Sequence, residues 1–144
     1  MSEVCRVVNF HLRALAHIRK YLDKHTANTL AACIIGSRID YCNSLFAGLS
    51  DSNLLCLQRL QNRATRIVMN SKGIVSCTEL LRELHWLPVV NRIDFKVALL
   101  TFKAITTQQP AYLWSSLVPY TVMRGLRSSS QHLLTVPHTR INLQ

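Results

Sequence analysis

Apolar and polar residues follow one another along this chain with the period of the α-helix. Apolar positions recur at intervals of three and four residues in six stretches, and Ser, Asp, Asn, Gly or Pro residues lie in the breaks between them. The predicted helices span residues 3–24, 27–47, 52–70, 76–84, 88–106 and 110–117. No convincing strand pattern occurs before residue 119. The sequence therefore predicts an all-α fold, a helical bundle of five or six helices.

Two of the predicted helices, 3–24 and 52–70, carry an apolar face opposite a basic one. At about 100° per residue, the basic face of the first holds Arg6, Arg13, His17, Lys20 and Lys24. The basic face of the second holds Arg59, Arg63 and Arg66, at positions i, i+4 and i+7. A basic stripe of this kind is either a solvated face or a set of contacts for phosphate groups, and the pattern leaves both open.

The other long helices have a different pattern. The helix 27–47 is apolar around most of its circumference, which predicts that it is the buried one. The helix 88–106 is also apolar nearly all round. After residue 118, Pro, Ser, Thr and Arg follow without a period. We therefore expect a helical bundle over residues 1–118 and an extended or partly disordered tail over 119–144.

Composition narrows the choice of partner. The 144 residues include 17 Lys and Arg against 7 Asp and Glu, a formal net charge of +10, and 49% of them are hydrophobic. Such a chain folds, and its charge favours a polyanion, either nucleic acid or an acidic membrane face. No apolar stretch approaches the roughly 20 residues that span a bilayer, and the N-terminus lacks a signal-peptide pattern. We expect an intracellular protein, nuclear or cytoplasmic, with nucleic acid rather than membrane as its partner.

The chain offers little chemistry for catalysis. Its seven acidic residues are scattered without an adjacent pair, whereas metal-dependent phosphoryl transfer needs clustered carboxylates. The five cysteines match no usual zinc spacing and include no CxxC pair, so we expect reduced thiols that fill the core. A cysteine nucleophile paired with His85 or His132 has no flanking motif. We therefore expect no catalytic residue, no metal, no cofactor and no small-molecule substrate.

A lone acid and several aromatic residues have structural interpretations as well as functional ones. Asp40 lies on an apolar helix, where a carboxylate needs a partner such as a nearby arginine or backbone donors. Trp86 precedes Pro88, and a proline fits the first position of a helix. Five aromatic residues either cover the core or stack on bases: Tyr21, Trp86, Tyr112, Trp114 and Tyr120.

Separated segments of the chain resemble one known series of motifs. They are residues 10–22, 37–45, 57–66, 81–89, 92–96, 100–104 and 126–130. In unbroken order from about Val4 to Arg140, these segments resemble the region after the catalytic palm in reverse transcriptases of non-LTR (LINE-type) retrotransposons, of the jockey and CR1/L2-like kind. Within them, the structural motif positions are Arg38, Asp40, Tyr41, Trp86 and Pro88.

The resemblance implies that this chain is a fragment of an RNA-directed DNA polymerase, truncated near Ile141–Gln144 and without the palm and its catalytic Asp residues. It implies a helical thumb, which grips the template–primer duplex, and therefore no polymerase activity. The expected function is sequence-independent binding of an RNA or DNA duplex or hybrid, with the missing fingers and palm as a second partner. The binding residues are predicted to be Arg6, Arg13, Lys20, Lys24, Arg59, Arg63 and Arg66. The alternative is a helical protein-interaction module or an inert transposon relic.

Overall fold

A computed structural model describes residues 2–71, 73, 75–121 and 133–135. Its helices are α1 (Ser2–Ile18), α2 (Lys24–Ala31), α3 (Ser37–Asp40), α4 (Asp51–Val68), α5 (Cys77–Glu83), α6 (Val89–Thr107) and α7 (Ala111–Trp114). A π-helical turn over Ala32–Gly36 joins α2 and α3 without a break, so the described residues form six helical rods. Among these residues no strand is present, only an isolated antiparallel bridge between Pro119 and Leu134. The predicted all-α fold is confirmed.

The chain divides into two compact units, Met1–Val97 and Ala98–Gln144, with the division inside α6. In the second unit, the N–H of Tyr120 donates to the carbonyl of Leu133 over 2.9 Å, beside the bridge. Part of the expected irregular tail is therefore paired backbone. The rest of the predicted tail, residues 122–132 and 136–144, lies outside the described residues.

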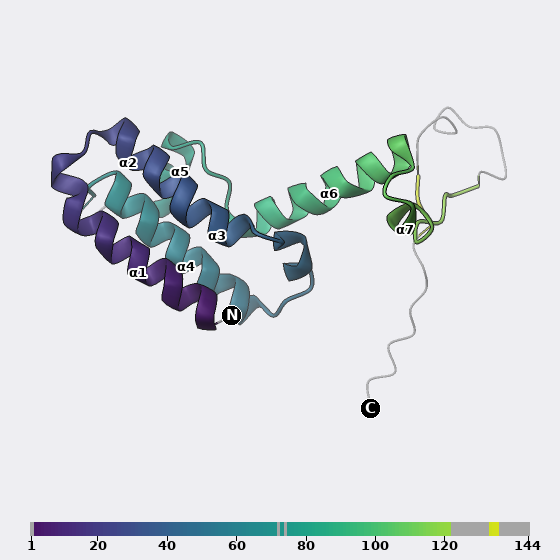
Figure 1. Ribbon diagram of the computed structural model, residues 1–144, viewed down its shortest axis with the longest axis horizontal. Coiled ribbons are helices and arrows are strands. Elements are labelled where there is room, and N and C mark those ends of the chain that lie inside the picture. The colour runs from purple at the N-terminus through teal and green to yellow at the C-terminus, as the bar shows by residue number, and fades with distance from the viewer. Residues whose placement is uncertain (1, 72, 74, 122–132, 136–144) are drawn as a thin grey trace. The chain divides into compact units, whose positions relative to one another are not determined.

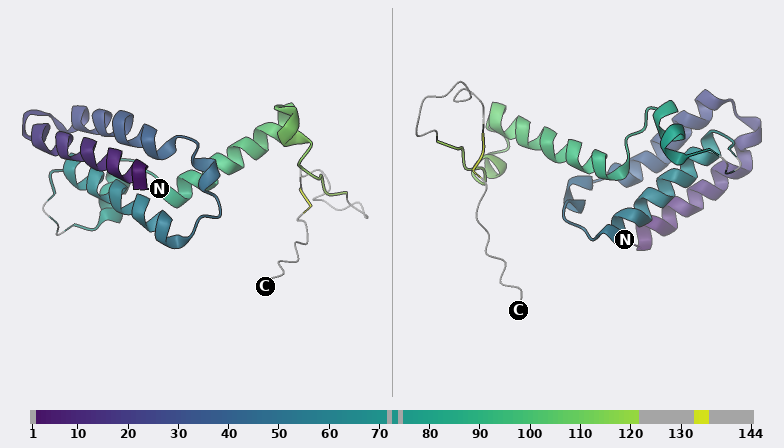
Figure 2. Two further views of the ribbon diagram at one scale, coloured as in Figure 1. Left: turned by 60° about the horizontal axis from the view of Figure 1, so that its bottom comes forward. Right: turned by 180° about the vertical axis from the view of Figure 1, so that it is seen from behind.

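In the first unit, α1 and α4 lie side by side, and the rod formed by α2 and α3 packs beside them (Figure 1, with further views in Figure 2). Contacts near the start of both helices and near the end of both show that α1 and α4 run parallel. The core is made by side chains spaced at helical intervals. Its fully buried members include Val8, Leu12, Ala27, Ala31, Leu57, Ala64 and Val68.

The second predicted helix is shorter and less buried than its composition indicates. It ends at Asp40, where Tyr41 turns to extended backbone and Cys42 adopts a positive φ of 52°. The rod buries one stripe, whose members include Ile35 and Ile39, while the side chains of Tyr41 and the following Leu45 are 77% and 78% exposed. The prediction that this helix is the buried one is wrong, because packing on one side of a bundle covers only one face of a helix.

The cysteines depart from the expected pattern for the same reason. Cys33 and Cys42 are exposed, whereas Cys5, Cys56 and Cys77 are half-buried, and all five are free thiols. The prediction that the cysteines fill the core is therefore wrong for Cys33 and Cys42. Cys33 lies on an exposed face of the rod, and Cys42 lies in the turn that follows it.

Two glutamines of α4 hold the start of α6. The side-chain amide of Gln61 donates to the carbonyl of Leu87 over 2.8 Å, and the side-chain oxygen of Gln58 accepts from the N–H of Val89 over 2.9 Å. Arg92 donates to the same Leu87 carbonyl and pairs with Asp40 over 2.6 Å. The expected arginine partner of Asp40 is thus confirmed, and the pair ties α6 to α3.

The C-terminal end of α4 is capped by an arginine from a neighbouring segment. The guanidinium of Arg19, in the 3₁₀ turn that follows α1, donates to the carbonyls of Ile67 and Val68 at 2.8–3.1 Å and to the carbonyl of Leu22 at 2.7 Å. Helix carbonyls at this end have no partner within the helix, and they carry partial negative charge. Arg19 satisfies both needs and joins α1 to α4.

Replacing Arg19 with alanine should therefore lower the free energy of unfolding by about 2 kcal/mol, the scale of charged hydrogen bonds lost from a partly buried site. Lysine at this position should recover part of the loss, since it keeps the charge but not the planar fork of donors. Urea unfolding followed by circular dichroism measures both effects. Arg13→Ala, at an exposed position of α1, is the control and should stay within about 0.5 kcal/mol. An equal effect of the two alanine variants would contradict the capping role.

Candidate nucleic-acid interface

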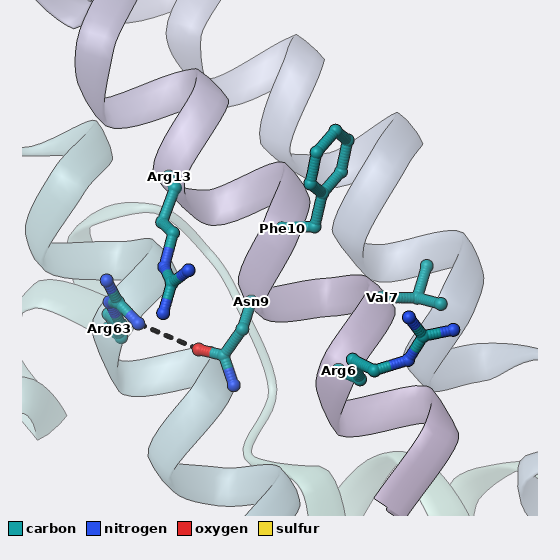
Figure 3. A pocket seen from close by; sticks show the side chains of 6 residues that line it. All are labelled: Arg6, Val7, Asn9, Phe10, Arg13 and Arg63. Carbon is teal, nitrogen blue, oxygen red and sulfur yellow. Dashed lines mark hydrogen bonds between the residues drawn. The ribbon is translucent and has the colours of Figure 1, made fainter.

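A groove of about 720 Å³ lies between α1 and α4, on the side where their basic faces meet. It is lined by Arg6, Val7, Asn9, Phe10, Arg13 and Arg63 (Figure 3). The parallel packing of the two helices brings part of each predicted stripe together, and Figure 3 shows the Arg13 side chain pointing toward Arg63. Two residues 50 positions apart in the sequence thus share one surface.

Arg63 is held in place by a neutral partner. Its Nη1 atom donates to the side-chain oxygen of Asn9 over 2.7 Å, across the α1–α4 contact. None of the hydrogen bonds found among the described residues involves the Arg13 side chain, which is exposed. The two guanidinium groups therefore keep their positive charge and several N–H donors for an outside ligand.

Arg6 is different, because it has an acidic partner one turn away. Its Nε and Nη2 atoms donate to both carboxylate oxygens of Glu3, at 3.0 and 2.6 Å. The hydrogen bonds from Arg6 lower the pKa of the Glu3 carboxyl, and those same bonds raise the pKa of Arg6. Glu3 itself does not line the groove, and the described lining includes no acid. The field of the groove therefore comes chiefly from Arg13 and Arg63.

The other predicted binding residues lie elsewhere. Arg59 is exposed on α4 outside the groove lining, and Lys20 is exposed with its ammonium 4.7 Å from the ring centre of Tyr21. Arg66 is half-buried, and its Nη1 atom is buried without a hydrogen-bond partner in the described part of the chain. The structure thus brings Arg6, Arg13 and Arg63 together and leaves the other members of the two stripes apart.

Lys24 does not belong to the first helix. The chain leaves the helical path at Leu22, and Asp23 accepts a hydrogen bond from the N–H of Thr26 over 3.1 Å, which begins a new helix. Lys24 is the first residue of α2, and its ammonium pairs with the carboxylate of Glu83 on α5. The prediction of Lys24 on the first basic stripe is wrong. An aspartate directly before a helix, where its carboxylate accepts from the N–H three residues later, is the sequence pattern that indicates the break.

Asn9 and Phe10 are groove residues that the charge pattern did not indicate. Asn9 lies between the apolar and basic faces of α1, where a short amide reaches the neighbouring helix. Phe10 is 69% exposed, an unusual exposure for a large apolar side chain. The sequence offered one signal for each residue. Asn9 is a polar residue at the border of two helix faces, and Phe10 is an aromatic residue among basic ones.

The predicted aromatic and motif residues differ in how far the fold buries them. Trp86 packs against the main core cluster, whereas the side chains of Tyr21, Tyr112 and Tyr120 are 74%, 70% and 51% exposed. Arg38 and Tyr41 line a separate hollow beside α1. Pro88 lies just before α6, where its carbonyl accepts from the N–H of Arg92 over 3.0 Å.

Comparison with protein-family models, with curated proteins and with solved structures gave no match. Within the described residues, no group of three or more His, Cys, Asp or Glu side chains is placed to hold a metal ion. None of the described helices has both the length and the apolar character needed to cross a bilayer. The groove lining offers arginine side chains, whose guanidinium groups are able to hold an anion.

Proposed function

We propose that this chain binds the phosphate backbone of nucleic acid, without preference for sequence, through the groove between α1 and α4. The observation that carries the proposal is the convergence of Arg13 and Arg63 from two helices onto a surface whose described lining has no acid. A guanidinium group donates two parallel hydrogen bonds to a phosphate and keeps its charge at every physiological pH. The net charge of +10 adds long-range attraction to a polyanion.

Asn9 prepares the groove for this ligand. The amide oxygen of Asn9 fixes Arg63 over the groove while the site is empty, and an amide is a weaker acceptor than a charged phosphate oxygen. A phosphate can therefore take over the Arg63 hydrogen bond at small cost, because the side chain is already in place. Contacts of this type position a nucleic acid but do not distinguish its bases.

The resemblance to reverse transcriptases gives this binding a context. We propose that the chain derives from the thumb of a non-LTR retrotransposon polymerase, with an RNA or DNA duplex or hybrid as its ligand. On this proposal the chain does not itself polymerise, because the palm that carries the catalytic carboxylates is a separate part of the enzyme. The motifs that carry the resemblance and the basic α1–α4 surface both support the proposal.

The test is a charge reversal in the groove. Arg13→Glu combined with Arg63→Glu should weaken binding to a short duplex of arbitrary sequence by at least about 100-fold at low salt, since two phosphate contacts become repulsive. Fluorescence anisotropy of a labelled DNA duplex and of an RNA–DNA hybrid measures the dissociation constants. The parent chain should bind unrelated sequences with equal affinity.

The matched control makes the same change in net charge elsewhere. Arg82 on α5 and Lys96 on α6 are exposed residues of the first unit, outside the groove. Their reversal to glutamate should reduce affinity less than about 10-fold, through the general field alone. If the two double variants bind equally, net charge and not the groove is responsible, and the proposed site is wrong.

A second candidate function is protein interaction, favoured by apolar side chains beside α1 and α3. A hollow beside α1 and α3 is lined by Val4, Val7 and Tyr41, among others, and Tyr41 is 77% exposed. Exposed apolar surface of this kind marks a contact site for another protein. The partner implied by the resemblance is the missing fingers and palm. A parent chain that fails to bind any nucleic acid at low salt would leave this surface as the functional one.

A further inference from the structure

Two free cysteines from different helices are in contact in the first unit. The sulfur of Cys5 on α1 lies 3.2 Å from the sulfur of Cys56 on α4, although 51 positions separate them in the sequence. Both side chains are half-buried. The other three cysteines are placed differently: Cys33 is exposed on the α2–α3 rod, Cys42 is exposed just after it, and Cys77 is at the start of α5.

We propose that Cys5 and Cys56 form a dithiol site, which a two-electron oxidant converts into an intramolecular disulfide that joins α1 to α4. The two helices are held parallel by core residues close to the pair, including Val8 and Leu60. A disulfide bond has a length of about 2.0 Å, so the sulfurs need to approach by only about 1 Å. Side-chain rotation can supply that movement without a change in the fold.

Glutathione disulfide is an oxidant that balances the reaction. The thiolate of one cysteine attacks one sulfur of glutathione disulfide, forming a mixed disulfide and releasing one glutathione thiolate. The second cysteine then attacks the protein sulfur of the mixed disulfide, which forms the Cys5–Cys56 bond and releases the second glutathione. Overall, two protein thiols lose two electrons and two protons, and one glutathione disulfide becomes two molecules of glutathione.

The driving force is proximity rather than an activated thiol. Burial raises the pKa of the Cys5 thiol, and the contact with Cys56 raises it further. Cys5 is therefore mostly protonated at neutral pH and is a slow nucleophile. Two thiols already in contact nevertheless have a high effective concentration toward each other. The site thus has the properties of a stabilising cross-link and not of a fast redox catalyst.

The cross-link should stabilise the first unit strongly. It would close a chain segment of 51 positions, and loops of this size reduce the entropy of the unfolded state by an amount that raises the folding equilibrium constant about 100- to 1,000-fold. The native helices need no rearrangement, so little of this gain should be lost to strain. The effect does not depend on nucleic-acid binding.

The experiment uses the full chain with three cysteines replaced, C33S C42S C77S, so that only the pair remains. In a buffer of glutathione and glutathione disulfide, this variant should form a monomer that lacks two hydrogen atoms by mass and carries no glutathione. The equilibrium constant for forming the disulfide against glutathione should be at least about 100-fold larger in native buffer than in concentrated urea, because folding is linked to the bond. A matched control, C5S C56S C77S, keeps the exposed Cys33 and Cys42 and should gain no such advantage from folding.

The unaltered chain provides a second measurement that needs no substitution. After oxidation, cleavage following Arg6, Phe46 and Arg59 separates Cys5 and Cys56 from the other cysteines, so the linked peptides identify the pair by mass. A Cys5–Cys56 link as the first disulfide to form supports the proposal. Glutathione adducts on both cysteines, intermolecular dimers, or equal equilibrium constants in native buffer and urea would overturn it.

Discussion

Replacing Trp86 with alanine should lower the free energy of unfolding by about 3–5 kcal/mol, the range for removal of a large aromatic side chain from a core. The half-buried indole packs against the main core cluster at the junction between α5 and α6. The N–H of Trp86 also donates to the carbonyl of Leu81 over 2.8 Å, which fixes the residue at the end of α5. Urea unfolding measured by circular dichroism gives the change.

The neighbouring residue supplies the control for this prediction. Leu87 lies in the same junction, but its side chain is 48% exposed, so Leu87→Ala should cost less than about 1 kcal/mol. The loss of unfolding free energy for Trp86→Phe should lie between those of the two alanine variants, because a smaller ring keeps part of the contact. If Trp86→Ala costs no more than Leu87→Ala, the indole is not part of the core and is free to contact a ligand.

The positions of the helices could be predicted because helix starts and ends depend on local residues. The predicted helix 52–70 corresponds to α4, which ends in a turn where Asn70 has a positive φ of 50°. The N–H of Ser71 then donates to the carbonyl of Arg66 over 3.0 Å. Asparagine tolerates this left-handed backbone better than most residues, so the stop could be predicted from its type and place.

The amount of burial could not be predicted in the same way. Hydrophobic content predicts which face of a helix packs, but it does not show how many neighbours the helix has. The predicted helix 27–47 has apolar side chains around most of its circumference, yet the bundle covers one stripe of the α2–α3 rod, and Ile34 remains 38% exposed. The number of covering elements is a property of the tertiary arrangement, which a single helix pattern does not contain.

The partners of the basic side chains were the other property that the sequence pattern could not predict. Arg19 reaches the end of α4, and Lys24 reaches Glu83, in each case across dozens of positions. Among the ion pairs of the described residues, that of Arg6 and Glu3 is the local one, at a spacing of three residues on α1. Counting the charges on a helix face thus overestimates the number of cationic side chains that remain available to a ligand.

The corrected set of cations predicts how the proposed binding depends on salt. Ion pairs engage Lys24 and Arg6, Arg66 is half-buried, and the ammonium of Lys20 lies over the ring of Tyr21. Arg13, Arg59 and Arg63 are therefore the stripe cations best placed to contact phosphates. Each phosphate contact on duplex DNA contributes about −0.9 to the slope of log K against log salt. The slope should therefore be about −3, and affinity should fall about 60-fold for a fourfold rise in salt. Anisotropy titrations at a series of sodium chloride concentrations measure it.

Removing the charge of Glu3 should add one contact to this interface. Glu3→Gln releases Arg6, which lines the same groove as Arg13 and Arg63, so the slope should steepen to about −4 and low-salt affinity should rise several-fold. Glu79→Gln changes the net charge equally from an exposed position on α5 and should leave the slope near −3. The difference between the two variants isolates Arg6, because the general field changes by the same amount in both. Equal slopes for the two variants would place Arg6 beyond the reach of the bound phosphates and restrict the interface to the Arg13 and Arg63 side of the groove.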